Sequence, residues 1–540
     1  MSYLKHTLTL VLTIMLMTAW ADEDHLNCFT DRDVYVSGDQ IRINVLMPVK
    51  SNSKTLYVDL SGFSGKTICG VKLKVENHRA EGTLQIPDSL KTGTYLLRSF
   101  YNQNHHKELF IRDLMIANRF EDFSEGFNRS MNKLEGKLPV SKLDLELSVP
   151  DTIERRSKAM LKLKFTPDQL QQIEGGLSVS IARQVKDFQS GEEYFTQQLQ
   201  ANESPISEDH GLVVSGKVIN KTSGLSVADA TVYLSVPDSI PGFQYAVTDR
   251  TGSFNFLMKE VYGMIPVVIQ AVKEKETDQL KVVADEKFNF KNPLFTSIQT
   301  KKYENAGEQM KGMVESFTFS KIFSSGEVAT DKLPFKNDKT SPLFYGEPNY
   351  VIRPDEFYDL KNFTEISREL LIGVKFRDKN ENLSLNLMDF ERGEYFDEQA
   401  FVLVDGVPVQ DMKIIQNMGT SAIDWIHSVL EYRFYGDIGL PGVIAIGTNE
   451  EGLKWLKESD RLLKFNYEGL QVKEKQKEPA VSAHHPDLRS LLIWEPNQEP
   501  SAEMEFEFKS SDISGDYKIS VTGKKKNGEV FQSERIIHIN

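Results

Sequence analysis

The feature that most constrains the fold is a two-residue alternation of apolar and polar side chains. Near the N-terminus it comes in short runs separated by turn sequences such as Ser37-Gly38-Asp39 and Lys91-Thr92-Gly93. Successive side chains of a strand point to opposite faces, so period-two runs broken every 8–12 residues or so predict an antiparallel sandwich. The runs are Val34–Val36, Ile41–Val45, Leu56–Leu60, Val71–Val75, Gly82–Ile86 and Tyr95–Phe100.

Further alternating runs predict three more β regions. Because 540 residues exceed what one hydrophobic core can use, several domains are expected. Asn527-Gly528 is typical of a tight hairpin turn between the last two strands. The runs are Leu143–Leu147, Leu161–Phe165 and Leu177–Ile181, then Val213–Val218, Val232–Leu234 and Phe254–Phe256, and finally Leu491–Trp494, Met504–Phe508, Tyr517–Val521 and Ile536–Ile539.

The stretch between these β regions has a mixed pattern. Thr364–Leu371 reads as a short amphipathic helix that is capped by Thr364 and ends at Gly373. The apolar run Ala400–Val404 leads into an Asp405-Gly406 turn, and Gly442–Thr448 reads as a buried strand. These elements predict a small α+β domain. Residues 276–340 read as a connection with some helix, with a strand signal at Phe317–Ile322.

The N-terminus has the three parts of a secretory signal peptide. A basic start is followed by an apolar run from Leu8 to Met17 and the small-residue ending Ala19-Trp20-Ala21. Cleavage after Ala21 would leave Asp22 as the first residue of the mature chain. Since Cys28 lies too far on to serve as a lipidated cysteine, no lipid anchor is expected, and no later apolar stretch is long enough for a membrane helix.

Charge and cysteine content narrow the function classes. The 78 acidic against 64 basic residues give a net charge of -14, which repels nucleic acid phosphates. Cys28 and Cys69 are the two cysteines, so one disulfide is the maximum. A bridge between them and a pair of buried thiols both remain open.

The first β region resembles the second macroglobulin domain of bacterial macroglobulin-like proteins. The resemblance lies in Thr30–Asp39, Leu56–Val58, Ile86–Leu90 and Gly93–Arg98. It implies a macroglobulin-like sandwich and a role in binding peptidases. The family's covalent trapping uses a Cys-Gly-Glu-Gln thioester, and the sequence does not contain this tetrapeptide, so such binding would have to be non-covalent.

Residues 211–272 resemble the regulatory domain that follows some metallocarboxypeptidases, a transthyretin-like sandwich without catalytic groups. The matching runs are Val213–Val218, Ala228–Leu234 and Ala246–Phe256. Within the last run, Thr248–Gly252 is predicted to be a turn in which Asp249 caps the backbone and Gly252 supplies conformational freedom.

Residues 345–450 resemble the plug domain of TonB-dependent outer-membrane receptors. The resemblance is carried by the helix ending at Gly373-Val374, by Val402–Val409, and by Tyr435-Gly436 ahead of Gly439–Thr448. A receptor also needs a barrel, for which about 22 strands of about 10 residues would be required. The residues after Thr448 are too few, so a plug-like domain without a barrel and without a transport channel is expected.

Candidate catalytic and metal-binding patterns are weak. His78 and Glu81 with His210 could be written as a zinc set, but His78 lies in a sandwich strand pattern without a peptidase fold around it. The acidic segment Asp389–Glu398 does not follow calcium-loop spacing and is read as a solvated loop. No hydrolase elbow, phosphate-binding loop or dinucleotide motif occurs. We therefore expect no catalytic residue, no metal site and no cofactor, and a chain that is not an enzyme.

The predicted fold class is mainly β, with tandem antiparallel sandwiches, a small α+β domain and a C-terminal immunoglobulin-like β unit. The function expected is that of an exported binding or scaffold protein, in the periplasm or at the outer membrane of a Gram-negative envelope, whose partner is an envelope protein or surface ligand. The alternative is a macroglobulin-like endopeptidase inhibitor or peptidase-binding protein that lacks the thioester. The predicted segments are a signal peptide (1–21), a macroglobulin-like sandwich (22–115), a linker with a second macroglobulin-like domain (116–205), a carboxypeptidase regulatory-like sandwich (206–275), a connecting segment (276–340), a plug-like domain (341–475) and the C-terminal unit (476–540).

The signal peptide gives a direct test. We expect the mature chain to begin at Asp22 and to be recovered outside the inner membrane, because signal peptidase cuts after the small residue that follows the apolar run. N-terminal sequencing of protein purified from the producing cells checks this. A chain that keeps Met1, or that is found in the cytosol alone, would contradict it.

Overall fold

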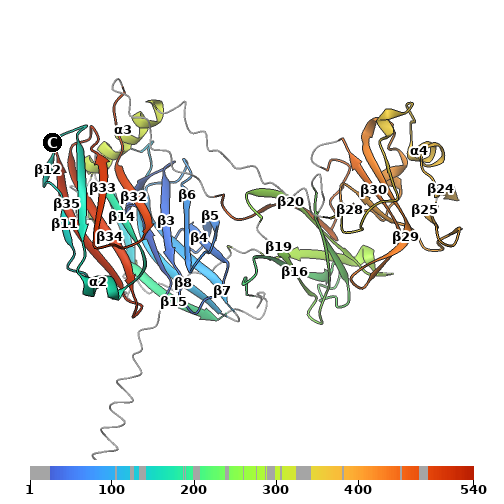
Figure 1. Cartoon of the computed structure of the whole chain (residues 1–540), viewed down its shortest axis with the longest axis horizontal. Helices are drawn as coiled ribbons and strands as arrows, with labels where there is room; N and C mark the ends of the chain where they lie inside the picture. Colours follow the sequence, from blue (N-terminus) through green and yellow to red (C-terminus); the bar gives the residue numbers. More distant parts are fainter. Residues whose placement is uncertain are drawn as a thin grey trace, which may run out of the picture. The chain divides into compact units, whose positions relative to one another are not determined.

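A computed structural model describes most of the chain, and the mainly β prediction is confirmed (Figure 1). The fold divides into two compact units. Unit 1 takes its residues from Met1–Leu212, Glu286–Leu333 and Leu470–Asn540, and unit 2 from Val213–Asp285 and Pro334–Gly469. The described residues are 25–103, 106–121, 127–132, 141–186, 188, 190–198, 207–237, 242–258, 261–274, 276–285, 288, 298–303, 307–323, 342–379, 382–449, 453–472 and 485–540.

Unit 1 begins with the predicted macroglobulin-like sandwich. Its apolar faces enclose one core, in which Cys28, Ile43 and Leu97 are buried. The last strand of the larger sheet, β15, lies far beyond the predicted boundary at residue 115 and pairs with β8. One sheet is β1 (Asn27–Thr30), β3 (Gln40–Leu46) and β6 (Arg79–Gln85); the other is β15 (Glu192–Gln198), β8 (His106–Ala117), β7 (Gly93–Gln103), β4 (Thr55–Ser61) and β5 (Thr67–Lys74), with β2 (Val34–Val36) parallel to β8.

The second sandwich of unit 1 corrects the predicted boundaries. Residues 116–205 and 476–540 were expected to form separate domains, but their strands alternate within one sandwich, as the teal and red strands of Figure 1 show. Neither segment could bury its apolar faces alone, and a single core takes Leu161 and Ile181 from one and Ile519 and Phe531 from the other. The sheets are β10 (Ser141–Lys142), β35 (Val530–Ile539), β34 (Gly515–Lys525), β14 (Ile173–Arg183) and β32 (Leu491–Gln498), with β12 (Thr152–Ile153) on β35, and β11 (Glu146–Ser148), β13 (Lys158–Lys164) and β33 (Glu503–Lys509).

The segment predicted as a connection also supplies ordered elements. Strand β22 (Ile298–Tyr303) pairs with β9 (Phe127–Asn132), and helix α3 spans Gly307–Phe323. The strand predicted at Phe317–Ile322 is therefore wrong. The side chains of Met310, Met313, Val314 and Phe317 recur at helical spacing and pack on one apolar cluster, which outweighs the local alternation.

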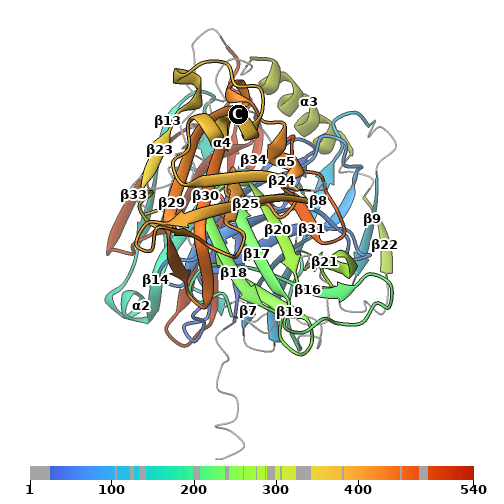
Figure 2. The same cartoon turned by 90° about the vertical axis from the view of Figure 1, so that its right-hand side faces the viewer.

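Unit 2 contains a β-sandwich where a carboxypeptidase regulatory-like sandwich was predicted, and its boundaries differ from 206–275. It is completed by β21 and by β31, a strand that the chain reaches after the plug-like region (Figure 2). The predicted turn is confirmed: Asp249 Oδ1 accepts hydrogen bonds from the backbone of Thr251 and Ser253 at 2.8 and 2.9 Å, and Gly252 has φ +74°. The sheets are β19 (Ser253–Met258), β16 (Leu212–Asn220) and β21 (Leu280–Ala284), and β18 (Gly242–Val247), β17 (Thr231–Val236), β20 (Met264–Val272) and β31 (Leu462–Glu468).

The rest of unit 2 is the predicted small α+β domain. Helix α4 is capped by Asn362, not by Thr364: Asn362 Oδ1 accepts a hydrogen bond from Glu365 N at 3.0 Å, which places the helix start earlier. Within the described ranges, no helix combines the length and apolarity that crossing a bilayer requires. The elements are β23 (Tyr350–Ile352), β29 (Ile423–Tyr435), β30 (Ile438–Thr448), β27 (Phe401–Val404) and β28 (Val407–Pro408) in one sheet, β24 (Val374–Lys379), β25 (Asn382–Asp389) and β26 (Glu394–Tyr395) in another, and helices α4 (Phe363–Glu369) and α5 (Lys413–Gln416).

The Asp405-Gly406 turn joins β27 to β28 as predicted. Val404 pairs with Val407, and both turn residues have positive φ, +49° at Asp405 and +78° at Gly406. The Asp405 carboxylate fixes this geometry, because it accepts hydrogen bonds from the backbone and hydroxyl of Thr448 and from the Trp455 indole at 2.7 to 2.8 Å.

The turn makes a specific prediction about stability. Gly406→Val should destabilise unit 2 by about 1–2 kcal/mol, since a β-branched residue is strained at positive φ. Hydrogen exchange should rise in β27, β28 and β30 and stay unchanged in the sandwiches of unit 1. Gly62→Val is the control, because a Cβ there would meet a single side-chain atom at 3.9 Å. Equal exchange in both variants would show that the turn does not need glycine.

Candidate functional site

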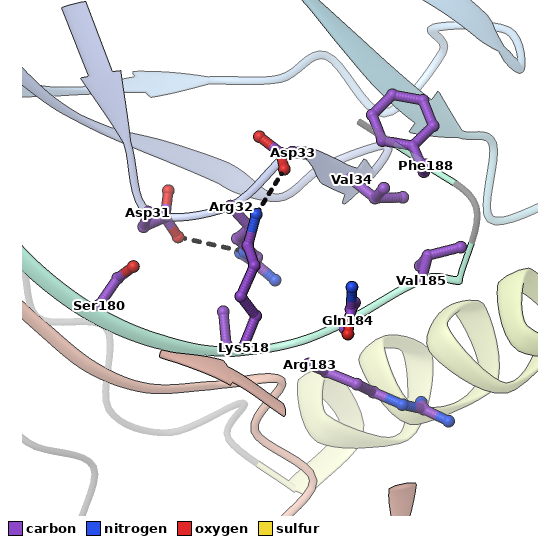
Figure 3. Close-up of a pocket in the computed structure, with 11 residues that line it drawn as sticks. Asp31, Arg32, Asp33, Val34, Ser180, Arg183, Gln184, Val185, Phe188 and Lys518 are labelled. Carbon is purple, nitrogen blue, oxygen red and sulfur yellow. Dashed lines mark hydrogen bonds and ion pairs between the residues drawn. The ribbon is translucent and has the colours of Figure 1, made fainter. Parts of the chain in front are cut away.

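Buried charged residues gather where the two sandwiches of unit 1 meet (Figure 3). Asp33 lies in the short connection between β1 and β2, Arg112 on β8 and Glu192 at the start of β15. Lys518 comes from β34 of the second sandwich and points toward Asp33. We call Asp33, Arg112, Glu192 and Lys518 the ionic junction.

The junction centres on the Asp33 carboxylate. Its Oδ1 accepts hydrogen bonds from Arg112 Nη2 and from Ser190 Oγ, and its Oδ2 lies 3.1 Å from Lys518 Nζ. The Nη1 atom of Arg112 pairs with Glu192 Oε1. Asp33 thus receives one cation from each sandwich, and its side chain is only 12% exposed.

A second group of ion pairs lies beside the first. Arg32 bridges Asp31 and Asp39 at 3.1 and 2.9 Å, and it also donates to the Ser490 hydroxyl of the second sandwich. Asp31 in turn accepts a hydrogen bond from the buried Tyr35 hydroxyl at 2.7 Å. The Thr30–Asp39 segment, noted in the sequence for its resemblance, is therefore where the first sandwich presents its charges to the second.

The pKa shifts of Asp33 and Glu192 show which of the two carboxylates is more strongly stabilised in its ionised form. Burial alone would raise the pKa of Asp33, but the charges of Arg112 and Lys518 outweigh it and hold that pKa well below its usual range. At Glu192, burial and the Asp33 charge outweigh Arg112, so the pKa of Glu192 is raised. Asp33 is therefore the firmly ionised partner of both cations.

The space beside the junction is small. A cavity of about 30 Å³ is lined by Asp31, Arg32, Asp33, Lys518 and neighbouring residues of β14 and the segment after it. Arg183 extends away from it in Figure 3. Such a volume suits one or two water molecules and is too small for a substrate. The arrangement holds the two sandwiches together.

The residues singled out from the sequence lie elsewhere. Ala21 and Asp22 are outside the described residues. Cys28 and Cys69 are thiols in the structure, with Cys28 buried, and burial raises the pKa of Cys28 to about 12. His78 lies in a tight turn with φ +59°. Among the described residues, no group of three His, Cys, Asp or Glu side chains could hold a metal ion.

The junction itself was missed in the sequence. Asp31, Arg32, Asp33 and Asp39 were considered only as part of a family-like motif. Four charged residues in a segment bounded by buried strands are a signal for an ion-pair cluster. Their partners, however, lie as far away as Lys518, and spacing along the chain carries no information about that contact.

Comparisons with known proteins leave the family open. No protein-family model matches the sequence, and no curated protein matches it. Among solved structures, a Salmonella alpha-2-macroglobulin mutant is 9% identical with a TM-score of 0.23, and trypsin-activated alpha-2-macroglobulin from Escherichia coli is 11% identical with a TM-score of 0.22. The alignments cover 96% and 95% of this chain but 40% and 41% of those proteins.

The ionic junction predicts a pH-dependent stability. Asp33→Asn should destabilise unit 1 by about 1.5–3 kcal/mol at pH 7, the range for hydrogen bonds to a charged group, because Arg112 and Lys518 lose the carboxylate they share and keep only Glu192 and Glu534. The folded pKa of Asp33 lies below its unfolded value of about 3.9, so its contribution is present above about pH 4 and is lost as the pH falls further. The gap between variant and wild type should therefore narrow as the pH falls from about 4 to about 3.

Urea unfolding between pH 3 and 7, with hydrogen exchange to locate the change, measures this gap. Asp151→Asn is the matched control, because the Asp151 side chain is 84% exposed and its pair with Arg535 should contribute under about 1 kcal/mol. A gap that is independent of pH would contradict the role of the Asp33 charge.

Proposed function

We propose that this chain is an exported, non-enzymatic binding or scaffold protein of a Gram-negative envelope, and that its plug-like domain carries the binding surface. The proposal rests mainly on the buried ion pairs of unit 1, which connect two sandwiches. In unit 1 the cluster around Asp33 joins two sandwiches and borders a cavity of about 30 Å³, so these charges serve cohesion. Two sandwiches that are held together by buried ion pairs are suited to act as a rigid spacer.

The plug-like domain exposes a set of large apolar side chains. Seven apolar side chains of this domain are more than 40% exposed: Val351, Phe357, Tyr358, Ile372, Phe390, Tyr432 and Phe434. Exposed apolar residues that gather on one domain are typical of interaction surfaces. Its fold is held by a continuous core that includes Phe363, Leu387 and Ile446, so these residues are displayed on a packed scaffold.

The export signal predicted at residues 1–21 supports the location outside the cytoplasm, and the resemblance of residues 345–450 to receptor plugs supports an accessory role at the outer membrane. The rival function, reversible inhibition of endopeptidases by the macroglobulin-like sandwich, rests on the resemblance of Thr30–Asp39 and its neighbours. The two functions use different parts of the chain.

Cross-linking of the full-length protein in intact envelopes distinguishes them. We expect partner peptides to be joined to residues 342–449, and the purified chain to leave a panel of endopeptidases uninhibited. Excess purified chain, added before the cross-linker, is the control for specificity. Inhibition that disappears on dilution, together with cross-links on residues 25–117, would replace the proposed function with the rival one.

A further inference from the structure

Three aromatic side chains, Phe396, Tyr432 and Phe434, form a connected strip on the plug-like domain, in which Phe396 is half-buried against the core. The ring of a fourth, Phe390, contacts Tyr350. Phe396 contacts Tyr432 with ring centroids 6.0 Å apart, and Tyr432 contacts Phe434 at 5.2 Å. Phe390 is tied to the same strand, because its backbone N donates to the carbonyl of Leu430 at 3.1 Å. Phe434 is 74%, Tyr432 45% and Phe390 42% exposed.

The fold builds this strip. Strand β25, which leads to Phe390, packs on β29 and β30 (Figure 2). The Tyr432 ring lies across the hairpin against Gly439, where any Cβ would collide with the tyrosine hydroxyl. Glycine at this position leaves room for the Tyr432 ring, which stays 45% exposed.

The segment that carries Phe390 and Phe396 is rich in exposed carboxylates. Glu391, Glu394, Asp397 and Glu398 are all exposed. Across the described residues none of these four forms an ion pair; the nearest cation along the chain, Arg392, pairs instead with Asp389 at 3.6 Å. Four unpaired carboxylates in the segment that also carries two of the aromatic rings create a negative potential that a cation would relieve.

The domain contains one cation–π contact of its own. The ammonium of Lys375 lies 3.1 Å from the centroid of the Tyr395 ring, next to Phe396. A lysine is thus held on an aromatic face at the edge of the strip. Cation–π contact and ion pairing favour a ligand rich in Lys or Arg.

We propose that this surface, formed by Phe390, Phe396, Tyr432 and Phe434 with Glu391, Glu394, Asp397 and Glu398, binds a flexible basic segment of a partner protein. The proposal rests on the proposed function and names the chemistry of the partner. A neutral glycan would also stack on aromatic rings, but it would leave the four carboxylates uncompensated. The charge therefore favours the basic peptide.

Binding of synthetic probes to the purified full-length chain tests the surface. The probe is a fluorescein-labelled 12-residue peptide in which Lys or Arg alternates with Ser; the same peptide with Glu at the basic positions, and maltohexaose, are the comparison probes. Fluorescence anisotropy at 0.05 and 0.3 M NaCl should show binding of the basic peptide alone, weakening with salt.

Matched double variants separate the surface from general attraction by net charge. Tyr432→Ser/Phe434→Ser should weaken peptide binding roughly tenfold, from the loss of two cation–π faces. Glu391→Gln/Glu394→Gln should weaken it and flatten the salt dependence. The controls are Val351→Ser/Phe357→Ser and Glu356→Gln/Glu369→Gln, which change equally exposed residues of the same domain outside the surface and should alter affinity less than about twofold.

The outcomes are distinct. Equal weakening by surface and control variants would overturn the proposal, because binding would follow net charge alone. Absence of peptide binding, or maltohexaose binding that depends on Tyr432 and Phe434, would overturn it as well. None of these results bears on cross-linking in the envelope, so the surface can fail while the proposed function stands.

Discussion

The structure of unit 1 depends on one buried carboxylate held between two cations. Asp33 belongs to the first sandwich, Arg112 pairs with it from the same sandwich, and Lys518 reaches it from the second. Taking such charges out of water is costly unless the geometry satisfies them, so the contact restricts the two sandwiches to arrangements that keep all three groups together. Apolar contact among Phe29, Leu46, Trp494 and Val530 adds cohesion nearby. Apolar surfaces tolerate sliding, whereas a buried ion pair does not.

In both units, a sandwich is built from strands that lie far apart in the sequence. The second sandwich takes β13 and β14 from one part of the sequence and β32 to β35 from another, and the sandwich of unit 2 is completed by β31. Without the strands from the distant segment, each sandwich would have an unpaired edge strand and an incomplete hydrophobic core. Domains of this protein are therefore defined by pairing and not by position in the sequence.

Much of the local structure could be predicted from the sequence. Alternation located most strands, and turn chemistry located Asp405-Gly406 and Asn527-Gly528, where Gly406 and Gly528 both adopt positive φ. Local signals are reliable here because they describe contacts between near neighbours. They failed at Phe317–Ile322, where the packing of α3 on an apolar cluster overrides an alternating pattern, and at Thr364, where Asn362 provides the cap.

Long-range pairing could not be predicted in the same way. Nothing in β14 indicates that Ile181 should lie opposite Ile519, because any strand with an apolar face could fill that place. The ionic junction has the same origin, since Asp33 and Lys518 meet only once both sandwiches exist. A single sequence indicates that a strand or a buried charge needs a pairing partner, but it does not identify which strand or residue that partner is.

The discontinuous second sandwich has a consequence for how the chain matures. Synthesis proceeds from the N-terminus, so β13 and β14 emerge long before β33 and β34, with which they pair. Until β33 and β34 have left the ribosome, these early strands carry open edges that could pair with other chains. Completion of this sandwich is thus a late event, and a chain arrested before its last strands would expose adhesive β edges and be a target for chaperones or proteolysis.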